Sequence, residues 1–228
     1  MTTRRKPAKS ATAGTRGGAP AQERELRAQG KKTMRKLLDA GMVVFEKRGY
    51  HAARVDDIVK VAKTSHGTFY LYFANKEDLF RALAIDVSAA MTDLAAELQP
   101  VGPGPEGYAE LRGWLERFSD LYVHYGPVIR AWTEVELVEN DLGKLGSDVL
   151  ASFAQGIGER IAEVNDNVHP QIAALAFISM IERFNYLVLS RQIDFDRAEM
   201  LDTLAALTHA GLFAGTRDAK AGKRLRRA

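Results

Sequence analysis

A pair of short helical segments joined by a tight turn, between about residues 55 and 73, constrains this chain more than any other feature. In the second segment Phe69 and Phe73 are four residues apart and fall on one helical face. A buried helix would leave many polar groups unsatisfied, whereas phosphates would accept their hydrogen bonds. The polar side chains of this segment are Ser65, His66, Thr68, Tyr70 and Tyr72. The pattern predicts a helix-turn-helix whose second helix enters a DNA major groove.

Helix signals on both sides extend this unit. Apolar residues recur at helical spacing over residues 32–47, and Gly49 follows them as a helix-ending residue. Thr33 either caps this helix or, if the helix starts earlier, faces a phosphate. Asn75 is a favourable N-cap for the next helix, and Asp78 occupies its capping-box position.

Together these motifs resemble the DNA-binding domain of the TetR family of transcriptional regulators, over about residues 33–83. The resemblance is carried by Phe45, Gly49, Val55-Asp56-Asp57-Ile58, Gly67-Thr68-Phe69-Tyr70, Tyr72-Phe73 and Lys76-Glu77-Asp78-Leu79. It implies that His66, Thr68 and Tyr70 lie at the DNA face and that Lys76 binds a phosphate at a helix N-terminus. The full set of expected DNA-contacting residues is Thr33, Arg54, Thr64, Ser65, His66, Thr68, Tyr70, Tyr72 and Lys76.

The chain departs from the family pattern at two positions. Arg54 stands where members usually carry Thr, so it can contact phosphate but cannot cap the following helix. Lys63 stands in the turn where Gly is usual, and we expect it to adopt a positive φ at an energetic cost.

The charge distribution divides the chain. Residues 1–85 contain 18 Lys and Arg against 8 Asp and Glu, whereas residues 86–215 contain 8 against 20. A basic N-terminal part and an acidic remainder suit a DNA-binding head on a body that phosphates repel. We expect a disordered basic arm at 1–30, the helix-turn-helix domain at 31–83, a helical effector-binding and dimerisation domain at 84–215 and a basic tail at 216–228. The arm is either a solvated terminus or a DNA-binding element.

Everything after residue 75 reads as helix, and the fold class expected is all-α. The segment 100–105, rich in Pro and Gly, ends one helix, and Gly126-Pro127 should end the next. The expected helices after the DNA-binding unit cover 76–99, 106–125, 128–138, 143–164, 171–190 and 197–213. With the three before them they make nine, which resembles the TetR architecture.

Aromatic residues follow one face of the helices in the body, and on periodicity alone they are ordinary core. The resemblance implies instead that these helices enclose an effector cavity, in which polar residues orient an apolar or amphipathic small molecule. The candidate ligand-binding residues are Trp114, Phe118, Tyr122, Trp132, Glu136, Phe153, Phe177, Phe184 and Asn185.

The last two long helices are candidate dimer elements. Leu201, Leu204, Ala205, Thr208 and Leu212 form a stripe with small residues, and Ile172, Leu175 and Ser179 offer a matching surface. Both stripes could also pack within one subunit. A homodimer is expected because one short recognition helix binds weakly, and two-fold dimers read palindromic DNA.

Other function classes find little support. The chain has no Cys, its five His are scattered, and it has neither a G-x-S-x-G motif nor a P-loop, so we expect no enzyme, cofactor or metal site. Apolar runs look too short for a membrane span, and a cytoplasmic protein is expected. The preferred hypothesis is a dimeric repressor that a small molecule releases from a palindromic operator. A constitutive regulator or activator of the same fold, and a small-molecule carrier, remain as alternatives.

Overall fold

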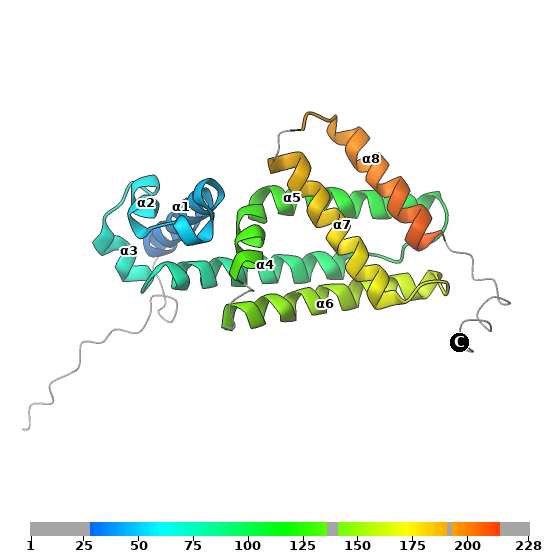
Figure 1. Cartoon of the computed structure of the whole chain (residues 1–228), viewed down its shortest axis with the longest axis horizontal. Coiled ribbons are helices and arrows are strands. Elements are labelled where there is room, and N and C mark those ends of the chain that lie inside the picture. The colour runs from blue at the N-terminus through cyan, green and yellow to red at the C-terminus, as the bar shows by residue number, and fades with distance from the viewer. Residues whose placement is uncertain (1–27, 136–140, 191–192, 215–228) are drawn as a thin grey trace, which may run out of the picture.

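The computed structural model describes residues 28–135, 141–190 and 193–214, and within these ranges the ordered elements are all helical. An N-terminal head holds α1 (Ala28–Ala52), α2 (Val55–Val61) and α3 (His66–Tyr72). α4 (Lys76–Glu97) runs from the head into a body of α5 (Pro105–Val135), α6 (Asp141–Val164), α7 (Pro170–Ser190), α8 (Arg197–Thr208) and the π-helical turn η2 (His209–Phe213). Figure 1 shows the head at one end of an elongated molecule. The predicted arm, the tail and Glu136 lie outside the described residues.

Local sequence signals set the helix ends in the head as expected. Gly49 has φ 71° and interrupts α1, and Lys63 has φ 49° in the turn before α3. Ser65 caps α3 by accepting a hydrogen bond from the amide of Thr68, and Asn75 caps α4 by accepting one from the amide of Asp78. These predictions are confirmed. They could be made from the sequence because each feature depends on neighbours within a few residues.

The structure decides between the two alternatives for Thr33 and contradicts the helix end expected at Gly126-Pro127. Thr33 does not cap α1, which begins earlier, and its hydroxyl donates to the carbonyl of Gln29 at 3.0 Å. Gly126-Pro127 does not end a helix, because α5 continues through Pro127. Figure 1 shows that α5 bends along its course, as expected of a helix that contains a proline. The following residues Val128, Ala131 and Trp132 are buried in the core of the head, and this packing offsets the lost backbone hydrogen bond. The described chain therefore has eight α-helices and one π-helical turn rather than nine helices.

Two hydrophobic clusters form the core. The first fills the head and takes Leu79, Phe80, Leu83, Ala84 and Val87 from α4, besides the end of α5. The second fills the body around Trp114. The Trp114 ring stacks with the rings of Phe118, Phe153 and Phe177, and each pair of ring centres is at most 6.0 Å apart. Because α4 and α5 contribute to both clusters, head and body share their packing.

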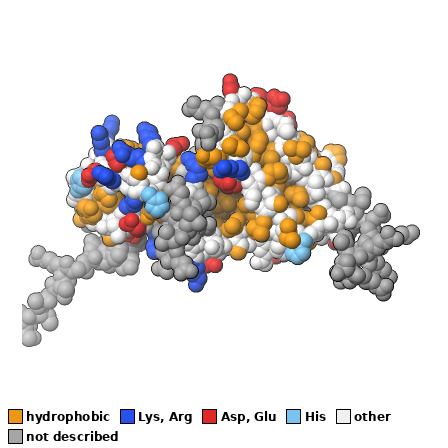
Figure 2. Space-filling view, in the orientation of Figure 1, with side chains coloured by type: hydrophobic (Ala, Val, Ile, Leu, Met, Phe, Trp, Pro, Cys, Tyr) orange, Lys and Arg blue, Asp and Glu red, His pale blue; other side chains and the backbone are white. Residues whose placement is uncertain are grey.

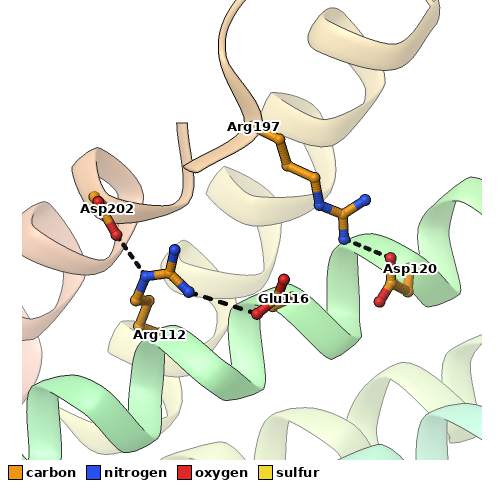
Figure 3. Close-up of polar contacts among 5 residues, drawn as sticks. All are labelled: Arg112, Glu116, Asp120, Arg197 and Asp202. Atoms are coloured by element: carbon orange, nitrogen blue, oxygen red, sulfur yellow. Dashed lines mark hydrogen bonds and ion pairs between the residues drawn. The ribbon is translucent and has the colours of Figure 1, made fainter. Parts of the chain in front are cut away.

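Ion pairs fasten α8 across α5. Arg112 of α5 bonds Asp202 of α8 and also Glu116, while Arg197 at the start of α8 bonds Asp120 (Figure 3). These side chains are largely exposed, so each pair contributes little stability, but together they fix the direction of α8.

The stripe predicted for dimerisation on α8 is internal core. Leu201, Leu204, Ala205 and Thr208 are at most 3% exposed and pack against the body, and Leu212 is half-buried in the same cluster. The stripe on α7 differs: Ile172 is 66% and Leu175 45% exposed, and Ser179 is exposed as well. Figure 2 shows apolar side chains spread over the face of the body formed by α7 and α8.

α7 also corrects the expectation about membrane spans. Within the described residues, the segment Pro170–Leu189 is long and apolar enough to cross a membrane by length and composition alone. Its buried side, with Ala174, Phe177 and Ile181, belongs to the core of the body, as expected for a packed helix.

Candidate functional site

The N-terminus of α3 is built by side chains that hold each other. The Ser65 hydroxyl lies 3.1 Å from the Thr68 amide and 3.0 Å from the Thr68 hydroxyl. His66 Nε2 lies 2.6 Å from a carboxylate oxygen of Asp56 in α2, which ties the two helices of the motif together. This arrangement fixes the end of α3 that a helix-turn-helix presents to base edges.

The outer face of α3 is exposed, while its inner face is anchored. Phe69 is fully buried and Phe73 nearly so, whereas Tyr70 is 57% and Leu71 70% exposed. A rigid helix therefore presents one phenol and one isobutyl group outward. Figure 2 shows that Lys and Arg side chains gather on the head and are sparse on the visible face of the body.

A polar groove of about 280 Å³ runs between α1 and α3. It brings Thr33 of α1 together with Thr64 and Thr68, and Lys32 and Lys36 stand along the same side. Hydroxyl groups and ammonium groups around one concavity are the donors that hold a DNA phosphate.

A second, apolar cavity of about 400 Å³ lies in the body between α4, α5, α6 and α7. Its lining is mostly aliphatic and aromatic, with few polar groups: Val87, Met91, Phe118, Tyr122, Ile129, Trp132, Gly146, Val149, Leu150, Ile178, Ser179, Glu182 and Arg183. A cavity of this size and character suits a small apolar molecule.

One polar pair stands out on the cavity wall. The hydroxyl of Tyr122 donates to a carboxylate oxygen of Glu182 at 2.8 Å. Burial raises the pKa of Tyr122 well above its usual value; the hydrogen bond to Glu182 and the charge of that carboxylate act in the same direction, and Arg130 acts against them. The phenol therefore keeps its proton and remains a donor.

Comparison with known proteins identifies the head. Residues 37–83 match the family described as bacterial regulatory proteins, tetR family. The head of this chain is therefore similar to the DNA-binding domain of that family.

Two curated relatives illustrate how far the similarity extends. The HTH-type transcriptional regulator YdgC of Bacillus subtilis (strain 168) is 36% identical over 73 residues, which is 32% of this chain and 37% of YdgC. The A-factor receptor protein of Streptomyces griseus is 24% identical over 180 residues, 77% of this chain and 60% of the receptor. The match thus spans less than two thirds of either relative.

A solved structure extends the likeness of the TetR fold to the body. The transcriptional regulator FadR from Bacillus subtilis in complex with stearoyl-CoA aligns with a TM-score of 0.59 at 17% identity, covering 80% of this chain and 99% of FadR. At this identity the likeness concerns the fold alone.

Most of the residues expected to contact DNA lie together on the head. Arg54 is exposed and makes no capping hydrogen bond with its side chain. Tyr72 is half-buried against the core of the head, so only part of its side chain can reach outward. Lys32 and Lys36, which line the groove with Thr33, and the exposed Leu71 were not among the residues expected from the sequence.

Lys76 takes a position that the sequence did not indicate. Its ammonium donates to the backbone carbonyl of Tyr50 at 2.9 Å and lies 3.4 Å from that of His51, at the end of α1. It also stands 4.5 Å from the centre of the Tyr50 ring. We therefore revise its expected role: the side chain stabilises the C-terminus of α1, and a phosphate contact is not needed to explain its position.

The candidate ligand-binding residues divide into two groups. Phe118, Tyr122 and Trp132 line the cavity. Trp114, Phe153 and Phe177 form the aromatic stack of the core, and Phe184 packs against the same cluster without lining the cavity. Asn185 is also structural, since it accepts from the Ser119 hydroxyl at 2.7 Å and donates to the Ile181 carbonyl at 2.8 Å.

Sequence reasoning missed the walls that α4 and α6 contribute. Val87 and Met91 come from α4, and Gly146, Val149 and Leu150 come from α6. Glu182, which accepts the hydrogen bond from Tyr122, lines the cavity as well. The signal available was the apolar face of α4, which continues past the residues that the head needs. Among the described residues no group of His, Asp and Glu is arranged to hold a metal ion.

Proposed function

We propose that this protein is a homodimeric transcriptional repressor that binds a palindromic operator through α3 and is released when a small apolar or amphipathic molecule enters the cavity. The observation that carries the proposal is the shared helix α4. Leu79, Phe80 and Leu83 in its first turns are fully buried in the core of the head. Val87 and Met91, one and two turns further on, line the cavity.

This arrangement gives a ligand a mechanical connection to the DNA-binding surface. A molecule between α4 and α6 contacts Val87 and Met91 directly, and α4 is continuous from there to Lys76, four residues after the end of α3 at Tyr72. A displacement of α4 therefore moves the head. To release DNA the ligand must bind better to the DNA-free arrangement, and operator must weaken ligand binding by the same factor.

A second copy of the chain is the proposed partner of α7. Its exposed side carries Ile172, Leu175, Met180 and Leu187, each between 39% and 66% exposed, with small residues such as Ala176 and Ser179 between them. Such a row is typical of a self-complementary helix interface. In the dimer the two α3 helices must stand about 34–36 Å apart, or a multiple of that distance, to reach successive major grooves.

The small-molecule class rests on the cavity lining and on the relatives. One relative is named as the receptor of a ligand, A-factor, and the structure of FadR was solved in complex with stearoyl-CoA. This chain is similar to them, and its cavity is mostly apolar. We infer an apolar or amphipathic effector for this protein, and expect it to act on DNA in the cytoplasm.

The experiment is displacement of operator DNA by a probe. A labelled palindrome selected from random DNA is bound to the full chain, and N-phenyl-1-naphthylamine, a neutral apolar dye, is titrated while fluorescence anisotropy reports the bound fraction. We expect release from the wild type and weaker release from Val149→Trp, which narrows the cavity. Leu207→Trp, at an exposed position of α8, is the matched control and should behave as wild type.

A constitutive regulator or activator of the same fold is the second candidate. It would bind the same palindrome in a salt-sensitive way, since phosphate contacts dominate such affinity. Unchanged anisotropy at saturating dye in both the wild type and Val149→Trp would favour it over the repressor.

A further inference from the structure

The polar groups of the cavity restrict what the effector can be. Resting on the proposed function, we propose that the effector is an uncharged apolar molecule with a hydrogen-bond donor, a hydroxyl or N–H group, that donates to the Glu182 carboxylate. Neither a carboxylate nor a fully charged ammonium head group fits this position.

The first step is the direction of the hydrogen bonds on the inner wall. Tyr122 is 1% exposed and its proton is committed to Glu182 at 2.8 Å. An ionised carboxylate is an acceptor only, with room on its two oxygens for more than one hydrogen bond. At this pair the wall therefore offers a ligand an acceptor, and a ligand group placed against Glu182 must bring the donor; the donors of the lining, Ser179 and Arg183, are separate side chains.

The second step is the charge balance around that acceptor. A ligand carboxylate next to Glu182 would bring two negative charges together beside mostly apolar side chains, which is unfavourable. A ligand cation would be repelled by the positive charge of Arg183, which lines the same cavity. The guanidinium of Arg183 lies 4.8 Å from the centre of the Tyr186 ring. Arg130 stands over the same ring at 5.7 Å. A neutral donor satisfies Glu182 without adding net charge.

The third step is the remaining surface. Phe118, Ile129, Trp132, Val149 and Ile178 surround the polar pair with aromatic and aliphatic groups. These residues favour binding of an apolar skeleton, but they change the affinity between one apolar skeleton and another by only a small factor. Discrimination therefore depends on Glu182, since a site built to bond a donor rejects the analogue that lacks it.

The test compares four probes with one skeleton: 4-phenylbutan-1-ol, its methyl ether, 4-phenylbutyrate and 4-phenylbutylamine. Binding to the full-length protein without DNA is measured by calorimetry. We expect the alcohol to bind about tenfold or more tightly than the ether, and more tightly than either charged probe. A preference for the ether, the carboxylate or the amine overturns the proposal.

Two substitutions at Glu182 separate its charge from its acceptor role. Glu182→Gln should improve binding of the carboxylate, and Glu182→Met should abolish the preference of alcohol over ether. Glu163→Gln, the same change at an exposed position on α6, is the control and should alter neither. Unchanged preferences in both Glu182 variants contradict the assignment. If none of the four probes binds while N-phenyl-1-naphthylamine does, the inference falls and the proposed function stands; if the dye does not bind either, both fall.

Discussion

The guanidinium of Arg35 in α1 lies 3.1 Å from Nε2 of His124 in α5, and it also reaches Asp86 of α4 at 3.5 Å. This single side chain connects the head to both helices that enter the body. Asp39 on α1 holds it in place at 3.0 Å.

Arg35→Ala should weaken the coupling between ligand and DNA more than it weakens the fold. The contacts are exposed, so we expect a loss of less than about 1 kcal/mol in the free energy of unfolding. The ratio of operator dissociation constants with and without N-phenyl-1-naphthylamine should fall toward one. Arg117→Ala, which removes an ion pair between α5 and Glu97 far from the head, is the control. Equal coupling in the two variants would show that Arg35 is not part of the connection.

Substitutions at Lys76 and Lys36 should affect different properties, the stability of the fold and the binding of DNA. Lys76→Met removes the contacts to the end of α1 and should lower the free energy of unfolding by about 1–2 kcal/mol in urea titrations. Lys36→Met removes a charge from the groove between α1 and α3, and should reduce the salt slope of DNA binding by about one without loss of stability. The reverse assignment of the two effects would return Lys76 to the DNA interface.

The interface on α7 predicts which substitutions give monomers. Ile172→Asp or Leu175→Asp places a charge on the exposed stripe and should give a folded monomer in sedimentation, with operator binding greatly weakened. Leu204→Asp buries an unpaired charge in the core of the subunit and should unfold it, at a cost of several kcal/mol. A folded dimer in both α7 variants would place the interface elsewhere.

Tyr50 should make the head sensitive to alkali. Burial, with help from Glu77, raises its pKa from 10.0 to about 12. A group whose pKa is raised on folding contributes stability that is complete below its unfolded pKa and lost as the pH rises toward the folded value. Stability should therefore fall between about pH 10 and 12, and Tyr50→Phe should flatten this part of the curve. The dependence of stability on pH is also measured for Tyr122→Phe as a comparison, because the pKa of Tyr122 is raised as well but its hydroxyl lies in the body and not in the head.

The parts of this fold that sequence reasoning predicted are those set by near neighbours. The caps Ser65 and Asn75, the glycine at 49 and the strained turn at Lys63 each follow from a few adjacent residues. Pro127 misled because the burial of Val128 and Trp132, invisible in the local pattern, keeps the helix going. The stripe on α8 misled for a related reason: apolar periodicity shows that a face is buried but not whether its own subunit or a partner covers it.

The candidate sites divide in the same way. The exposed face of α3 follows from the anchors Phe69 and Phe73, which fix the helix rotation. The cavity depends on where α4 and α6 come together, so the apolar pattern around Met91 and Val149 could not by itself assign these residues to a cavity. Lys76 likewise reaches carbonyls 25 and 26 residues away in the sequence.

The most direct test of the central claim is the affinity of the cavity for N-phenyl-1-naphthylamine with and without operator. Because the coupling is reciprocal, a protein saturated with its palindrome should bind the dye more weakly than the free protein, by the same factor by which the dye weakens operator binding. A scrambled duplex of equal length should have much less effect. If the dye binds the free and the operator-bound protein with equal affinity, while Val149→Trp reduces both equally, the cavity is a binding site without control over DNA, and the account of α4 as the connection between them is contradicted.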